Sequence, residues 1–120
     1  MAEVRPRGET ERTPSYDGRR FRLTMTGGVP TNRNLVLECR QEGDIVIGTY
    51  TGDNLEYGAL LATVRAMGCL EARFQHVTTA LHIETGRCWA TPQLTSGGQM
   101  RLYIEWHMGA REGVSVLEEI

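Results

Sequence analysis

One histidine stands on the apolar side of a strictly alternating stretch of the sequence. Residues 70–77 read LEARFQHV, with apolar and polar side chains at alternate positions. Successive side chains of a β-strand point to opposite faces, so His76 shares the face of the apolar residues. An enclosed imidazole can transfer protons as a general acid or base, or it can be a hydrogen-bonded core residue. We take His76 as the candidate acid–base residue, with Tyr57 as the residue that orients a substrate.

Further side chains are expected to gather at the same rim as His76. Following the apolar face of each alternating segment places four candidate ligand-binding residues there: Met25, Thr49, Trp106 and Met108. A mostly apolar set with a few polar groups is typical of small-molecule pockets, although each of these residues could also be ordinary core. The loop 26–33 is the longest at this rim and is a candidate lid.

The same face assignment puts an arginine and a carboxylate towards the other end. Arg87, Trp89 and Glu118 would point inward there. An unpaired buried charge is very costly, so Arg87 and Glu118 would have to pair. This pair would form either a structural plug or an anion site, and we count all three residues as candidate ligand-binding residues.

A polar stripe on the outward face is the rival site. It comprises Arg73, Gln75, Tyr103 and Glu105. A register shift of one residue exchanges the two faces of a strand, so this stripe would line the interior if the face assignment were inverted. If the stripe does face outward, its residues suit an interface, for example that of a homodimer.

Composition excludes several kinds of chemistry. All thirteen basic residues are arginine, which rules out Schiff-base chemistry and a P-loop lysine. The formal net charge of -2 gives no global attraction for nucleic acid or an anionic membrane. The three cysteines Cys39, Cys69 and Cys88 fit neither a disulfide framework nor a clustered zinc site. Two of the three histidines fall on the outward face, so we expect no metal and no cofactor.

The elements that carry these residues are predicted to be strands. Eight alternating segments are separated by turn residues: 19–26, 34–40, 44–52, 54–65, 69–77, 80–90, 99–108 and 113–119. Short links containing glycine make neighbouring strands antiparallel. Eight such strands close most simply as an all-β up-and-down barrel, which removes exposed sheet edges. Residues 57–67 also show helical spacing, so a helix is the alternative there.

The N-terminal residues 1–18 differ in composition from the rest. They contain Pro6, Pro14 and few large apolar side chains, which predicts a flexible tail. A flap over one end of the barrel is the alternative. The remaining residues 19–120 form a single domain. No apolar run approaches twenty residues, so we expect neither a membrane span nor a leader peptide, and we expect the protein in the cytoplasm.

Several short motifs resemble a family of short bacterial proteins. They are GDIVIGTY at 43–50, FQHV at 74–77, TGRC at 85–88, EW at 105–106 and the terminal EEI at 118–120. Members of that family often carry the label N-acetylglutamate synthase, and the family looks like a calycin-type barrel similar to lipocalins and avidins. Acetyl transfer from acetyl-CoA would need a glycine-rich loop that opens a helix to hold the pyrophosphate. The sequence has no such loop, so we do not expect an acetyl-CoA transferase.

These observations favour a β-barrel that binds an apolar or aromatic small molecule with one polar end. One alternative is a cofactor-free isomerase, cyclase or hydrolase that uses acid–base residues in the barrel pocket. The other is an interaction protein with a packed core. The expected partner is a small molecule rather than nucleic acid or a membrane, with a homodimer as a further alternative.

Overall fold

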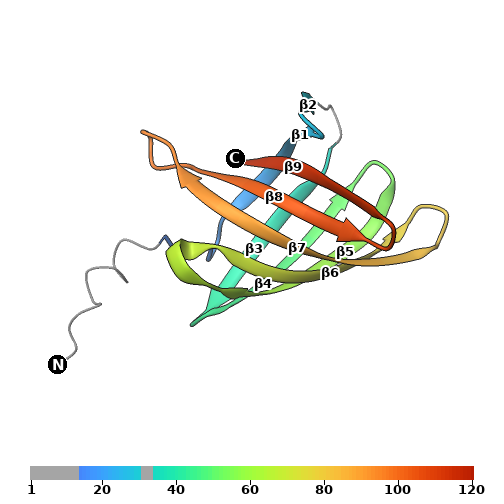
Figure 1. Ribbon diagram of the computed structural model, residues 1–120, viewed down its shortest axis with the longest axis horizontal. Coiled ribbons are helices and arrows are strands. Elements are labelled where there is room, and N and C mark those ends of the chain that lie inside the picture. Colours follow the sequence, from blue (N-terminus) through green and yellow to red (C-terminus); the bar gives the residue numbers. More distant parts are fainter. Residues whose placement is uncertain (1–13, 31–33) are drawn as a thin grey trace.

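Consecutive strands pair antiparallel all the way around the molecule, and the last one returns to the first (Figure 1). The computed structural model describes residues 14–30 and 34–120. Its strands are β1 (Arg20–Thr26), β2 (Val29–Pro30), β3 (Val36–Glu42), β4 (Ile45–Gly52), β5 (Leu55–Val64), β6 (Leu70–Thr78), β7 (Ile83–Leu94), β8 (Met100–Met108) and β9 (Arg111–Glu119). The two-residue β2 only extends the end of β1. The other eight strands form a closed barrel because β1 also pairs with β9, as predicted from the sequence.

The ambiguous segment 57–67 is mostly strand. Strand β5 continues to Val64 and is followed by a single 3₁₀ turn, η1 (Ala66–Gly68). The helical spacing arose because both faces of β5 carry leucine. Leu60 is buried, whereas Leu61 is 59% exposed on the outer face. The predicted strand is therefore confirmed. No helix in the described part of the chain is long and apolar enough to cross a membrane.

The face assignment was right for some strands and wrong for others. On β6 and β8 the alternation predicted the inward residues correctly. On β4 the inward residues are Val46, Gly48 and Tyr50, and not the two isoleucines of that strand. The same inversion holds for most of β5, for β7 and for β9. Each of these four strands has a glycine at an inward position and at least one apolar residue that is exposed on the outer face.

Three inward glycines explain why small residues are needed inside. Each glycine is the direct cross-strand partner of an aromatic residue, and a Cβ atom at the glycine would overlap the aromatic ring. The three pairs are Gly58 with Tyr50, Gly86 with Phe74, and Gly113 with Trp106. A glycine inside a strand often marks such a close approach. These rings fill the space that glycine leaves inside the barrel.

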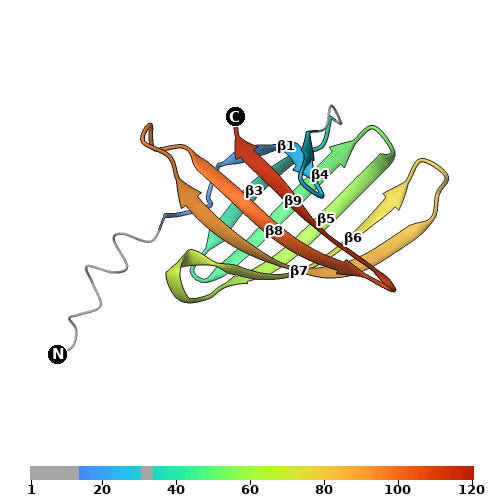
Figure 2. The same cartoon turned by 45° about the horizontal axis from the view of Figure 1, so that its top comes forward.

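One end of the barrel is closed by the segment that precedes β1 (Figure 2). Tyr16 is fully buried, and its hydroxyl donates to the carbonyl of Gly68. Its backbone N–H donates to Oε1 of Gln41 at 2.7 Å. Residues 14–18 thus form the flap that was the alternative for this region, whereas a tail up to residue 18 was wrong. The rest of the predicted tail, residues 1–13, lies outside the described residues.

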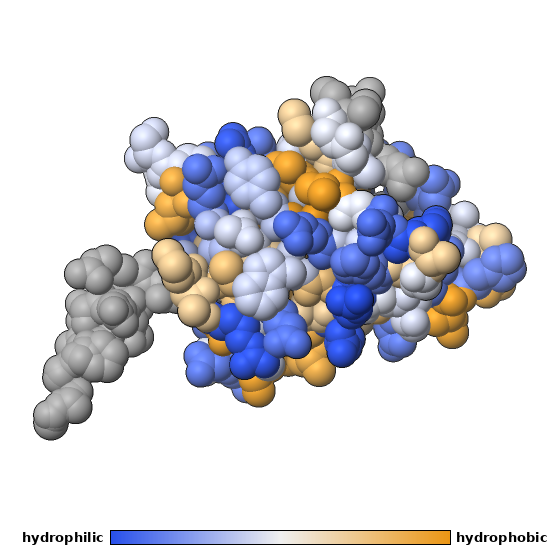
Figure 3. Space-filling view, viewed as in Figure 1, coloured by the Kyte–Doolittle hydropathy of each residue, from blue (hydrophilic) through white to orange (hydrophobic). Residues whose placement is uncertain are grey.

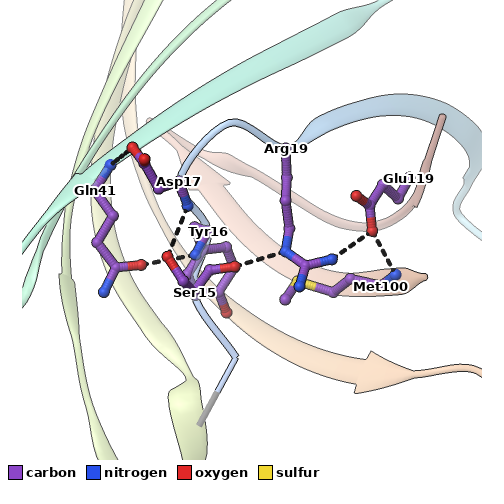
Figure 4. A network of polar contacts seen from close by, with 7 residues as sticks. All are labelled: Ser15, Tyr16, Asp17, Arg19, Gln41, Met100 and Glu119. Carbon is purple, nitrogen blue, oxygen red and sulfur yellow. Dashed lines mark hydrogen bonds and ion pairs between the residues drawn. The ribbon is translucent and has the colours of Figure 1, made fainter. Parts of the chain in front are cut away.

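An ion pair completes this closed end (Figure 4). Nη1 of Arg19 lies 2.6 Å from Oε1 of Glu119, and the same oxygen accepts the backbone N–H of Met100 at 2.8 Å. Both charged side chains are mostly buried, with 23% and 17% of their surfaces exposed. The inward acid of β9 is therefore Glu119, one residue beyond the predicted Glu118.

Replacing Tyr16 tests the importance of this plug. We expect Tyr16→Phe to lower the free energy of unfolding by about 1–2 kcal/mol, because the buried Gly68 carbonyl loses its hydrogen bond. Urea denaturation measures the change. The matched control is Tyr57→Phe, since Tyr57 is 54% exposed and its variant should keep the wild-type midpoint. Equal effects in both variants would contradict a specific role of Tyr16.

Candidate functional site

A chain of three hydrogen-bonded side chains lies at the end of the barrel opposite the plug. Oη of Tyr50, near the end of β4, is 2.9 Å from Nδ1 of His76 on β6. Nε2 of His76 is 2.9 Å from Oε1 of Glu84 at the start of β7. Nη2 of Arg111 lies 3.4 Å from the other oxygen of Glu84. The chain thus leads from the buried phenol of Tyr50 to a partly exposed carboxylate.

The charge of Glu84 fixes the direction of these hydrogen bonds. The hydrogen bond from His76, aided by the charge of Arg111, lowers the pKa of Glu84 below its usual value. An ionised carboxylate can only accept, so Nε2 of His76 must carry the proton that faces it. In the neutral ring Nδ1 is then an acceptor, and Tyr50 donates to it. Burial raises the pKa of Tyr50, which keeps the phenol protonated as this direction requires.

Aromatic side chains hold His76 in place. Its ring stacks on Phe74 at a centroid distance of 6.1 Å and meets Tyr50 edge-on at 5.8 Å. The cross-strand partner of His76 is Gly58, the glycine beneath the Tyr50 ring. The histidine is therefore enclosed, with 11% of its side chain exposed. Packing and both hydrogen bonds fix its orientation.

A second polar contact lies on the neighbouring wall. Nε1 of the partly buried Trp106 donates to Oγ of Ser115 at 3.1 Å. Oγ1 of Thr26, at the end of β1, lies 3.5 Å from the same oxygen. All three residues sit near the same rim as Glu84, where β1 and β8 end and β7 and β9 begin. The open end thus combines aromatic walls with several polar groups.

The structure brings only part of the predicted rim set together. His76, Trp106 and Met108 alternate with the outward residues of their strands and face inward, as predicted. The inward placement of Tyr57 was wrong, because Gly58 takes the inward position. Thr49 was also misplaced, since its neighbour Tyr50 is the inward residue. The candidate lid 26–33 lies partly outside the described residues.

Met25 is outside for a different reason. The pairing of β1 with β9 shifts its register between Leu23 and Met25. A bulge of this kind inserts one residue and reverses the alternation beyond it. Met25 is consequently 39% exposed, and Thr26 takes the position near Ser115.

The three residues predicted at the closed end also lie outside. Arg87 and Trp89 are exposed on β7, because Cys88 between them is buried. Glu118 is paired with Arg101 on the outer face, with 3.1 Å between Nε and Oε2. A buried pair between Arg87 and Glu118 was therefore wrong, and the pair of Arg19 with Glu119 occupies that end instead.

The alternative polar stripe lies on the outer surface. Arg73, Gln75, Tyr103 and Glu105 are all exposed, so the inverted assignment was wrong for β6 and β8. Tyr103 donates to Oε1 of Gln93 at 3.1 Å. Among the described residues, none of these four takes part in the hydrogen bonds that join Tyr50, His76 and Glu84.

Sequence reasoning missed the two partners of His76. Tyr50 and Glu84 lie on strands whose faces were inverted, so both were assigned outward. The sequence of β4 did contain a signal for the correct face, because Gly48 and Tyr50 are two residues apart and therefore share one face of the strand. A glycine on one face of a strand marks the place where a ring from a neighbour needs room.

A shallow groove of about 640 Å³ lies on the outer face of β4 to β8. Its lining includes Ile47, Leu61, Arg73, Arg87 and His107. These side chains point away from the barrel interior, so the groove is separate from the chain of Tyr50, His76 and Glu84.

Two of the three thiols, those of Cys39 and Cys88, are buried. Burial raises the pKa of Cys39 to about 12 and that of Cys88 to about 11, so thiolate chemistry is not available at either position. Among the residues that the structure describes, no group of three His, Cys, Asp or Glu side chains could hold a metal ion.

An antiparallel meander of eight strands that closes on itself defines a calycin-like barrel. The avidin-like protein family matches residues 14–120, so the chain belongs to this family. The predicted similarity to avidins is thereby confirmed at the level of the fold, and the expectation that the protein is not an acetyl-CoA transferase stays a prediction. No curated protein and no solved structure gives a match to the chain.

The lowered pKa of Glu84 makes a prediction about stability and pH. Its stabilising contribution is complete above the unfolded pKa of about 4.3 and is lost as the pH falls through the lower folded value. The free energy of unfolding should therefore decrease less in Glu84→Gln than in wild type between about pH 5 and pH 3. Denaturant titrations at several pH values measure this difference. Parallel pH profiles of the two proteins would contradict the proposed link, and Glu56→Gln, an exposed change, serves as the control.

Proposed function

We propose that this protein binds a small molecule at the open end of its barrel, an apolar or aromatic ligand with one polar end. The observation that carries this proposal is the chain of Tyr50, His76 and Glu84 at the end of the barrel opposite the plug. Family membership supports small-molecule binding in general terms. The ligand itself is the part that experiment must supply.

The two parts of the proposed ligand correspond to two parts of the site. Trp106 and Phe74 offer aromatic surface, which stacks favourably on flat apolar groups. The polar end would meet Glu84 and the hydroxyl of Ser115, whose oxygen accepts from Trp106 and lies 3.5 Å from the hydroxyl of Thr26. Fixed polar groups in an apolar setting give such pockets their specificity.

Fluorescence titration in a single-tryptophan protein tests this site. The sequence has two tryptophans, so Trp89→Phe leaves only Trp106 as the reporter. A panel of small aromatic acids, alcohols and amides should contain compounds that quench it saturably. Tyr50→Phe should weaken their binding about tenfold, because His76 loses a hydrogen bond worth roughly 1.4 kcal/mol and its fixed orientation.

The control for this titration is Tyr57→Phe, which removes the exposed hydroxyl outside the barrel. It should leave the dissociation constants unchanged. Quenching that never saturates, or that is equally strong in Tyr50→Phe, would remove the open end as the binding site. Circular dichroism of each variant confirms that the barrel is folded.

A second candidate is a cofactor-free isomerase, cyclase or hydrolase, favoured by the geometry of the same chain. The phenol of Tyr50 is a weak acid that is hydrogen-bonded to His76, and the carboxylate of Glu84 orients the histidine. Enzymes activate a reactive group with a neighbouring base in the same arrangement. Oη of Tyr50 would take a proton from the substrate while its own proton passes to Nδ1 of His76, and Glu84 would stabilise the imidazolium. Return of a proton to another substrate atom would complete an isomerisation or cyclisation.

His76→Ala separates the two candidates. An enzyme should lose turnover by on the order of 10²–10⁴-fold and still bind its substrate, whereas a binder should have no turnover to lose. The matched control is His82→Ala, a change at an exposed histidine. Turnover that survives in His76→Ala would eliminate this mechanism.

We propose a cytoplasmic location for the protein. The three cysteines are all free in the structure, which suits a reducing compartment.

A further inference from the structure

The shallow groove on the outer face of the barrel is lined by positive charge and by no carboxylate. Strongly hydrophilic and hydrophobic groups lie close together on this outer face, as Figure 3 shows over β7, β8 and β9. The polar side chains of the groove lining are those of Arg73, Gln75, Thr85, Arg87 and His107. Guanidinium groups are hydrogen-bond donors only. The lining of the groove is therefore suited to a ligand that accepts hydrogen bonds and carries negative charge.

Two arginines without a counter-charge lie side by side in this groove. Arg73 and Arg87 are direct cross-strand partners on β6 and β7, and like charges in that position are destabilising. Within residues 14–30 and 34–120, neither guanidinium lies within 4.0 Å of a carboxylate. The third basic residue of the lining, His107, is 3.3 Å from Glu112 through Nδ1. The unbalanced charge of the groove thus belongs to the two arginines, and a bound anion would balance it.

Acidic side chains lie on only one side of the two arginines. Glu71 and Glu105 line a smaller hollow that also borders the arginines, and Oε1 of Glu71 is 2.7 Å from Nη2 of Arg65. Towards the open end of the barrel, the next outward residues of the two strands are Gln75 and Thr85, which are direct partners and uncharged. An anion on this side of the arginines meets hydrogen-bond donors without meeting a carboxylate.

The cross-strand row that contains the arginines continues into apolar residues. Arg73 pairs with Leu61 on β5, and Leu61 pairs with Ile47 on β4. Both apolar side chains line the groove, with 59% and 38% of their surfaces exposed. Neighbouring strands are about 4.8 Å apart, so the row from Arg73 to Ile47 is about 10 Å long. This length suits a short alkyl chain or an aromatic ring.

We propose that this groove is a second binding site, which takes an organic carboxylate with an apolar chain or ring. The carboxylate lies between Arg73 and Arg87, whose planar guanidinium groups match its two oxygens. The apolar part lies across Leu61 and Ile47 and removes them from water. The groove volume of about 640 Å³ is sufficient for a small molecule of this kind. The site is separate from the open end of the barrel, so it does not depend on the function proposed above.

Calorimetric titration of the full chain with octanoate tests both halves of this site. Wild type should bind octanoate saturably and should bind acetate, which lacks the chain, at least about tenfold more weakly. Octanol lacks the charge and should be weaker by a similar factor. Arg73→Gln and Arg87→Gln should each weaken octanoate binding about tenfold, because each removes charged hydrogen bonds. Leu61→Ala should weaken it about threefold through lost apolar contact.

Matched controls separate these effects from general changes of charge or fold. Arg22→Gln removes an exposed arginine of β1 that does not line the groove, and Leu81→Ala shortens a leucine that is 75% exposed outside the groove. Both variants should bind octanoate as wild type does. Since Arg87→Gln removes one of two adjacent like charges, its melting temperature should be no lower than that of wild type, which shows that lost binding is not lost folding.

Three results would overturn the proposal. The first is octanoate binding that is unchanged in Arg73→Gln and Arg87→Gln, which would place octanoate elsewhere, for example at the open end. The second is the absence of saturable octanoate binding up to about 10 mM, the upper range of weak ligand binding. The third is inorganic phosphate that binds as tightly as octanoate, because it would leave the apolar half of the groove without a role.

Discussion

Closure of the sheet through the pairing of β1 with β9 is the constraint on which the rest of the structure depends. Closing a sheet of eight strands fixes a narrow interior that side chains from all strands must share. A small cross-strand partner makes room for a large ring in that space. Tyr50 opposite Gly58 and Trp106 opposite Gly113 meet this requirement. The position of the candidate site thus follows from where the barrel can accommodate an aromatic ring.

The two ends of the barrel satisfy their buried polar groups in different ways. A buried polar group that lacks a partner is costly, and at the plugged end Tyr16, Arg19 and Glu119 are all hydrogen-bonded within the chain. Glu119 accepts from both Arg19 and Met100. At the open end the chain of hydrogen bonds passes from Tyr50 outward and finishes on the partly exposed Glu84. At this end a polar side chain of the hydrogen-bonded chain, that of Glu84, is 36% exposed, which is why we place binding there.

The sequence predicted the number of strands, their order and the inward position of His76, because β6 and β8 alternate without ambiguity. It did not predict the faces of β4, because alternation assumes that the larger apolar side chain is the buried one. Ile47 is larger than Gly48, yet the glycine lies inside, where Leu37 already fills the space that a Cβ would need. The volume available inside the barrel decided which face of β4 points inward. That volume is a property of the closed barrel and cannot be read from one strand. Tyr50 was missed because β4 as a whole was assigned the wrong inward face.

The need for small residues inside does not by itself explain apolar residues outside. On β4 a serine or threonine in place of Ile47 would leave Gly48 and Val46 in the interior and would suit water better. The same holds for Trp89, which flanks the buried Cys88 on β7. The strands whose faces were hardest to predict are those that carry apolar side chains on both faces, because alternation alone does not tell which face is inside.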